Sequence, residues 1–445
     1  MTSNNNLSIF FKYHDKNISK EDYEIINSLI NIAIEHNNIE FKKYEFYNYS
    51  QLNCDTIVNS NLYSKEPKIL SAGGFSFLQA GMILNKENIK ETEGNWYDLL
   101  DPSTDNFRAI TTSGDPRGYY SSVFPTTAIN FDNIPICFSF PILPSSVDST
   151  QFLIQLNNGL YVKPLKFTFS PNTKFNEKQC IVVCGYFNNK ITTGPNALYP
   201  VSLEIVEASN GKRIMGVGPN GLYDMTGKTI NCSNPYTEPL GIASVVLTKY
   251  NLPGIFNYLG DIGCGVNKIE DINSPLVLYN NDAEYRIRIF TKGGYSPNGI
   301  TSMFPDSYEK YFYLQHKNPI TGEITDLKKS NYKYLFNNGT TYVEIIGLAD
   351  LGAKQSTYNQ TYIEDHDNQI DIVLKGNNSV IENIIYLIVP SDGNEYTKFY
   401  NPGGPGPTPI ENIKYTLPSE YQVFDIINNL ENPNCVTWIN TQQKL

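Results

Sequence analysis

Positive charge is scarce in this sequence. Lys and Arg together number 34 against 45 Asp and Glu, which gives a net charge of −11, and only 18% of the 445 residues are charged. The few arginines are spread over the chain, at Arg108, Arg117, Arg213, Arg286 and Arg288. Proteins that bind the phosphate backbone of nucleic acids need a basic surface. Nucleic acid is therefore not an expected partner.

Long apolar runs are also missing. A helix that spans a membrane takes about 18 to 20 consecutive apolar residues, and no run in the sequence approaches that length. The segment from Met1 to Ser8 has neither the basic nor the apolar stretch of a signal peptide. We expect a protein without a membrane span or signal peptide, located in the cytoplasm or elsewhere inside the cell.

Cysteine and histidine do not occur at the spacings of common metal or catalytic sites. The seven cysteines include no Cys-x-x-Cys pair and are odd in number, which fits neither a zinc framework nor a dense disulfide scaffold. We expect reduced thiols. The four histidines form no HExxH motif, and no serine lies in a GxSxG motif. A catalytic pair from distant positions stays open, with Cys264 as nucleophile and His316 or His366 as base, but a non-enzymatic protein is favoured.

Two glycine-rich segments resemble nucleotide-binding motifs only in part. Residues Gly216 to Gly221 satisfy GxGxxG, but the Pro-Asn-Gly within them is turn chemistry. Residues Gly221 to Thr229 have five residues between their glycines, where a P-loop has four, and no helical pattern follows. We interpret the whole piece as a hairpin.

Short apolar and aromatic runs are abundant. Hydrophobic residues make up 40% of the chain and aromatic residues 13%, with 32 Tyr among them, a composition that favours strands. From about residue 108 these runs are separated by Gly, Pro, Asn and Asp, as in β-sandwiches and barrels. The predicted strands are 134–140, 152–154, 165–169, 181–183, 201–206, 244–247, 285–290, 311–314, 342–346, 370–374 and 384–389.

The chain is too long for one ordinary hydrophobic core. We predict a mainly β protein with two β-sandwich-like domains, at residues 108–245 and 246–400. A small α+β region at residues 1–107 precedes them. A Pro/Gly linker with a short C-terminal helix follows at residues 401–445.

The two terminal regions are predicted from their local patterns. In the first, a strand from Leu7 to Tyr13 precedes a helix that Ser19 caps, and a second strand follows over residues 39–47. In the last, the Pro and Gly of residues 401–409 form the linker, and residues 423–430 form the helix.

The predicted strand 285–290 alternates in polarity. Arg286 and Arg288 fall on one face, while Tyr285, Ile287 and Ile289 fall on the other. This pattern predicts a half-buried strand whose arginines face away from the core.

One acidic segment concentrates potential metal ligands. Residues 364–371 read Glu-Asp-His-Asp-Asn-Gln-Ile-Asp and enter an apolar strand. Oxygen atoms of Asp365, Asp367, Asn368 and Asp371 are the hard ligands that Ca²⁺ prefers. The segment lacks the EF-hand pattern, so a solvated turn is the competing interpretation, and His366 as an acid or base is a third.

Tyrosines beside glycine-rich turns are candidate ligand contacts. Tyr119 and Tyr120 follow the turn 114–118, and Tyr295 lies within the turn 292–299. Their flat rings suit stacking on a sugar, although a chain with so many tyrosines places some at loop ends without any ligand.

Two functional hypotheses follow. The first is a non-enzymatic structural protein that associates with copies of itself, because a C-terminal helix on a flexible arm can exchange between copies. The second is a calcium-dependent carbohydrate- or protein-binding module, which would use the acidic segment and the tyrosines. Calcium is the only cofactor for which the sequence gives grounds.

Overall fold

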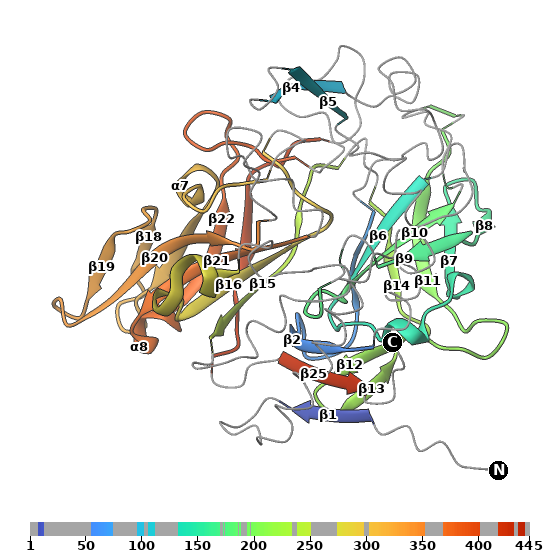
Figure 1. Ribbon diagram of the computed structural model, residues 1–445, viewed down its shortest axis with the longest axis horizontal. Helices are drawn as coiled ribbons and strands as arrows, with labels where there is room; N and C mark the ends of the chain where they lie inside the picture. Colours follow the sequence, from blue (N-terminus) through green and yellow to red (C-terminus); the bar gives the residue numbers. More distant parts are fainter. Residues whose placement is uncertain are drawn as a thin grey trace.

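The computed structural model describes residues 8–12, 55–73, 96–101, 106–111, 132–169, 172, 174–185, 187, 194–195, 197–233, 238–250, 274–297, 302–351, 368–400, 417–430 and 435–440. These residues are mainly β, arranged in several antiparallel sheets (Figure 1), which confirms the mainly β part of the predicted fold class. No helix within these ranges is long and apolar enough to cross a membrane.

The first lobe consists of two four-stranded sheets, in the orders β3-β6-β10-β9 and β14-β11-β7-β8. Apolar side chains from both sheets meet in one hydrophobic cluster, which includes Ile136, Phe152 and Leu203. Its strands are β3 (Ile69–Ala72), β6 (Asp132–Phe138), β7 (Phe152–Leu156), β8 (Tyr161–Val162), β9 (Lys166–Thr168), β10 (Cys180–Gly185), β11 (Pro200–Ile205) and β14 (Thr229–Asn231).

The second lobe consists of a six-stranded sheet, β19-β20-β21-β16-β15-β24, and a four-stranded sheet, β18-β17-β22-β23. Ile287, Leu314 and Leu387 belong to the cluster that both sheets share. The strands are β15 (Ile242–Lys249), β16 (Tyr285–Thr291), β17 (Tyr313–Lys317), β18 (Ile324–Leu327), β19 (Lys333–Phe336), β20 (Thr341–Ala349), β21 (Gln369–Gly376), β22 (Ile384–Val389), β23 (Gln422–Asp425) and β24 (Ile427–Asn428). The helices α6 (Pro275–Tyr279), α7 (Tyr308–Tyr311) and α8 (Asn378–Ile381) are short.

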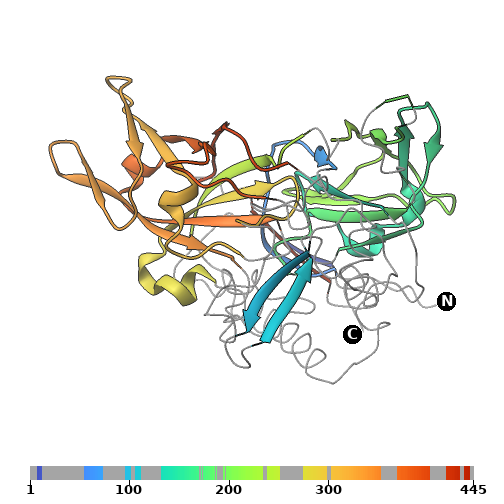
Figure 2. The ribbon, with the colours of Figure 1, turned by 90° about the horizontal axis from the view of Figure 1, so that it is seen from above.

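Both lobes have the same strand order. When the eight strands of the first lobe are numbered along the chain, its sheets read 1-2-6-5 and 8-7-3-4. In the second lobe, β19 and β24 are the outermost strands of the larger sheet. When these two are left out and the remaining eight strands are numbered along the chain, the sheets have the same two orders. Figures 1 and 2 show the first lobe, in teal and green, and the second, in yellow to orange, at opposite ends of the long axis.

Smaller sheets accompany the two lobes. The strands β1 (Ser8–Lys12) and β2 (Ile57–Asn61) flank β25 (Cys435–Asn440), and β4 (Trp96–Asp101) pairs with β5 (Asn106–Thr111). The strands β12 (Met215–Gly218) and β13 (Gly221–Asp224) form a hairpin in which Gly218 lies opposite Gly221. This confirms the hairpin predicted for the glycine-rich segment.

Most predicted elements have a counterpart. Each predicted strand between residues 134 and 389 overlaps a strand of the structure, and β1 confirms the first N-terminal strand. The helix predicted after Ser19, the strand over 39–47 and the linker over 401–409 lie outside the described residues. β15 runs through residue 245, where we placed a domain boundary, and pairs with β16 along its length.

The predicted C-terminal helix is wrong. Residues 422–425 form β23, which pairs with β22, and residues 427–428 form β24, which pairs with β15. Phe424 and Ile426, two residues apart, both pack against the hydrophobic cluster of the second lobe. A spacing of two is the period of a strand, whereas residues two apart on a helix point in different directions. Pairing with two existing strands also satisfies the backbone here.

Candidate functional site

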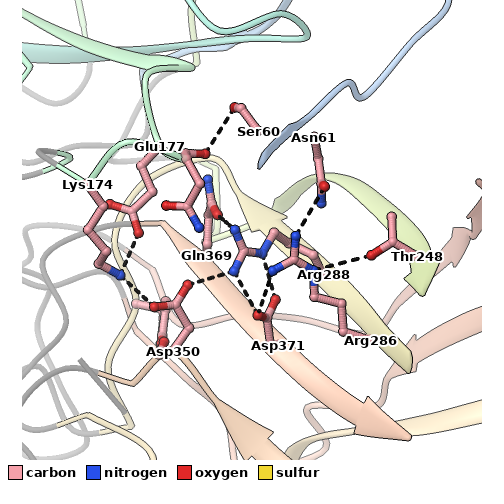
Figure 3. Close-up of polar contacts among 12 residues, drawn as sticks. Ser60, Asn61, Lys174, Glu177, Thr248, Arg286, Arg288, Asp350, Gln369 and Asp371 are labelled. Carbon is pink, nitrogen blue, oxygen red and sulfur yellow. Dashed lines mark hydrogen bonds and ion pairs between the residues drawn. The ribbon is translucent and has the colours of Figure 1, made fainter. Parts of the chain in front are cut away.

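The two lobes meet through side chains on the outer faces of their sheets. Cys137 on β6 and Cys180 on β10 belong to a small apolar cluster with Val246 on β15 and Phe290 on β16. The ring of Tyr63 stacks on that of Phe290, with 4.6 Å between ring centroids. Charged and polar side chains form a second contact between the lobes, and Figure 3 shows this network.

Strand β16 supplies the two arginines of the network. Tyr285, Ile287 and Ile289 point into the core of the second lobe, so the predicted alternation places Arg286 and Arg288 on the opposite face. The expectation of a half-buried strand is nevertheless wrong, because both arginines are buried. Their face of the sheet is covered by residues of the first lobe and of β2, so the strand has no face in water.

Arg288 is held by two carboxylates. Its Nε lies 2.6 Å from Oδ1 of Asp371, and its NH2 group lies 2.7 Å from Oδ2 of Asp371 and 2.9 Å from Oδ2 of Asp350. Its NH1 group donates to the side-chain oxygen of Gln369. Arg288 and Asp371 lie opposite each other on β16 and β21, so the strand register creates this two-point ion pair.

Two further cations extend the network into the neighbouring segments. Arg286 lies 3.5 Å from Oδ2 of Asp371 and donates to Asn61 on β2, at 3.2 Å. Lys174, in the segment before β10, lies 2.5 Å from both Asp350 and Glu177. The network thus connects the first lobe and β2 with the second lobe.

The charges of the network balance. Three cations, Lys174, Arg286 and Arg288, face three anions, Glu177, Asp350 and Asp371, and each of these side chains is at most 6% exposed. Burial by itself raises the pKa of the Asp371 carboxyl, but the positive charges of Arg288 and Arg286 hold that pKa below its ordinary value. For Arg288, burial lowers the pKa, and the attraction of Asp371 more than offsets this, so the pKa is raised.

Asp350 has an unusual backbone conformation. It follows β20 directly and has a φ of +59°, a region that costs free energy for residues with a side chain. The hydroxyl of Tyr295 donates to the backbone carbonyl of Asp350 at 3.0 Å. The carboxylate of Asp350 points toward Lys174 and Arg288.

The predicted calcium ligands are only partly described. Asp365 and Asp367 lie outside the described residues, while Asp371 pairs with two guanidinium groups. The amide of Asn368 donates to the carbonyl of Thr291 at 3.0 Å and accepts from Asn172 at 2.8 Å. Within the described ranges, no group of three or more His, Cys, Asp or Glu is placed to hold a metal ion. In this structure Asp371 belongs to an ion-pair network, and the calcium site over Asp365, Asp367, Asn368 and Asp371 stays a prediction.

Of the candidate sugar-binding and catalytic residues, some are buried and the others lie outside the described residues. Tyr295 is fully buried, so its ring cannot stack on a sugar, contrary to our expectation. Tyr119 and Tyr120 lie outside the described residues, as do Cys264 and His366. His316 is buried against the ring of Phe336, with 4.2 Å between centroids, and burial lowers its pKa.

A surface hollow lies at the outer end of the second lobe, where β18 and β19 are edge strands. It has a volume of about 430 Å³, and its lining combines aromatic rings with polar side chains. The lining residues are Asn318, Glu323, Thr325, Tyr332, Lys333, Tyr334, Leu335 and Phe336. We name it the outer groove.

Neither the buried ion-pair network nor the outer groove was predicted from the sequence. Lys174, Glu177 and Asp350 carry no local pattern, and only the carboxylate of Asp371 within the apolar run 370–374 hinted that a buried charge needs a partner. The aromatic run 332–336 was the available signal for the outer groove. Comparisons with protein-family models, with curated proteins and with solved structures found no match to this chain.

Proposed function

We propose that this chain is a non-enzymatic structural protein that associates with copies of itself, and that its two lobes are sandwich domains fixed to each other by the buried network. The repeated strand order supports the two sandwiches. It is the order of immunoglobulin-like sandwiches with the strands A-B-E-D in one sheet and G-F-C-C′ in the other. This analogy concerns the fold, and the functional proposal rests on the surface.

The proposal rests on exposed apolar side chains that lie beside edge strands in both lobes. At the outer end of the first lobe, Leu160, Tyr161 and Leu165 are exposed beside the edge strands β8 and β9. At the outer end of the second lobe, Ile320, Ile324, Tyr332 and Leu335 are exposed beside the edge strands β18 and β19. Edge strands with exposed apolar side chains are sites where another chain can add.

The two ends differ, which decides the kind of assembly. They lie at opposite ends of the long axis in Figures 1 and 2. Contact between unlike surfaces is heterologous, so it repeats from copy to copy and builds a filament or a closed ring. The buried network supports such an assembly because it fixes the angle between the two ends of each copy.

The test uses one substitution at each end. Tyr161→Lys places a charge at the first end, where Tyr161 is 60% exposed, and Leu335→Lys does so at the second, where Leu335 is 65% exposed. Each variant alone should run as a monomer in light scattering, while an equal mixture should form a dimer through the two unaltered ends.

The control is Val277→Lys, which changes an exposed apolar residue on α6 that belongs to neither end. It should associate like the parent protein. Variants that keep the parent mass would refute association through these ends.

Association through the C-terminal arm is a second route to the same function. In the structure β25 lies between β1 and β2 of the same chain, and exchange of β25 between copies would join them. A chain truncated before Gly403 should then lose its associated mass. An unchanged mass after truncation would eliminate this route and leave the two lobe ends.

The outer groove favours carbohydrate binding as a second candidate function. Tyr332 offers a half-exposed ring, and Asn318, Glu323 and Lys333 offer hydrogen-bond partners around it, the combination that sugar sites use. Binding to a glycan array should disappear in Tyr332→Ala. If calcium is required, Ca²⁺ should raise the melting temperature of the parent and not that of Asp367→Ala.

A further inference from the structure

Cys137 and Cys180 lie directly opposite each other on the neighbouring strands β6 and β10. The backbone N–H of Phe138 donates to the carbonyl of Gln179 at 2.8 Å, so residues 138 and 179 form a hydrogen-bonded pair. Pairs alternate along an antiparallel ladder, which makes the adjacent pair of Cys137 and Cys180 a non-hydrogen-bonded one. Pro135, which has no N–H, lies two residues from Cys137 and opposite Val182, in agreement with this alternation.

This register places the two thiols within reach of a bond. In non-hydrogen-bonded pairs the Cα atoms are about 4.5 Å apart, and disulfides join Cα atoms about 4.4 to 6.8 Å apart. The two side chains are hydrogen-bonded to each other and buried, and both are present as thiols.

The surroundings distinguish Cys137 from Cys180. The side-chain amide of Asn368 donates to Sγ of Cys137 at 3.2 Å, and Sγ of Cys137 lies 3.7 Å from the carbonyl of Thr291 as donor. An N–H donor aimed at sulfur stabilises the thiolate, which is the reactive form. Burial raises the pKa of the Cys137 thiol, but the neighbouring polar side chains, including those of Cys180 and Asn368, together with Lys292 lower it overall.

We propose that Cys137 and Cys180 are a peroxide-sensitive dithiol, in which Cys137 is oxidised first and Cys180 then closes a disulfide between β6 and β10. In the first step the Cys137 thiolate attacks one oxygen of the peroxide, the O–O bond breaks, and a sulfenic acid and water result. In the second step the Cys180 sulfur attacks the Cys137 sulfur, and the S–O bond breaks to release a second water. The two thiols lose two electrons and the peroxide gains them.

The disulfide would act at the contact between the lobes. It removes the S–H group that Cys137 directs at Thr291 of the second lobe, and it closes a loop between residues 137 and 180 in the unfolded chain. Loop closure raises stability by restricting that chain, so the melting temperature of the oxidised protein should rise by several degrees and fall back after reduction.

The experiment treats the full-length protein with hydrogen peroxide and counts thiols in denaturant. The count should fall from seven by two, and peptide mapping should find the Cys137–Cys180 pair. In Cys180→Ser a dimedone adduct should accumulate on Cys137, while Cys137→Ser should prevent both products. The matched control is Cys184→Ser, since Cys184 is another buried thiol of β10 but lies opposite Asn133.

A second experiment is needed because peroxide could reach the buried thiols of the folded protein only slowly. The protein is unfolded and refolded in a glutathione redox buffer, where both thiols meet the oxidant before the lobes close. The linked peptide pair after peroxide treatment supports the proposal. A pair that forms only in the glutathione buffer supports the geometry of the disulfide and overturns its sensitivity to peroxide. Absence of the linked pair from both experiments, or a dimedone adduct on Cys180 instead of Cys137, overturns the proposal.

Discussion

Replacing Asp371 with asparagine tests whether the buried network holds the lobes together. The substitution keeps the size of the side chain but removes the charge that faces Arg288 and Arg286. Both arginines are buried, so the network would be left with one uncompensated positive charge. Loss of one partner of a buried ion pair costs about 3–5 kcal/mol.

The expected loss lies near the lower limit of that range. The amide oxygen of asparagine still accepts a hydrogen bond from Arg288, and Asp350 stays 2.9 Å from the same guanidinium. We therefore expect Asp371→Asn to lower the free energy of unfolding by about 3 kcal/mol, measured by urea unfolding with circular dichroism. Domains are stable by about 5–15 kcal/mol, so the shift in the midpoint should be large.

The control is an exposed ion pair. Glu207 lies 2.6 Å from Arg213, and their side chains are 44% and 53% exposed. Because water screens such pairs, Glu207→Gln should cost less than about 1 kcal/mol. If Asp371→Asn is no more harmful than Glu207→Gln, the network does not hold the lobes together.

Three further predictions concern pH and backbone geometry. The lowered pKa of Asp371 means that its contribution to stability is complete above its ordinary value of 3.8 and is lost as the pH falls below it. Acid unfolding titrations should show a shallower loss in Asp371→Asn than in the parent. Burial lowers the pKa of His316 below its ordinary value of 6.5, so acidification below 6.5 should reduce the stability of the parent more than that of His316→Gln. In Gly376→Ala the added Cβ would clash with the backbone carbonyl oxygen of Tyr342. It should cost more stability in thermal unfolding than Gly322→Ala, where φ is also positive but no atom lies within 4 Å; equal costs would contradict the reasoning.

The strands could be predicted from local sequence patterns, because the alternation of side chains within a strand is set by consecutive residues. The alternation over 285–290 correctly assigned Arg286 and Arg288 to one face of β16, and the Pro-Asn-Gly turn correctly indicated the hairpin of β12 and β13. Side-chain period and turn chemistry are properties of a few consecutive residues.

The buried network and the C-terminal strands could not be predicted because they depend on contacts between residues far apart in the sequence. The residues that cover Arg288 include Lys174 and Asp350 within one network, and their spacing along the chain gives no sign of contact. The same holds for residues 422–428, whose pairing with β22 and β15 decided between strand and helix. Tertiary context overrides local propensity at such positions.

The most direct test of the account is the native mass of the purified full-length chain, measured by light scattering over a range of concentrations. A mass that is a multiple of 50.3 kDa and grows with concentration is the result that association through two unlike ends predicts. A constant mass of 50.3 kDa at every concentration would contradict it.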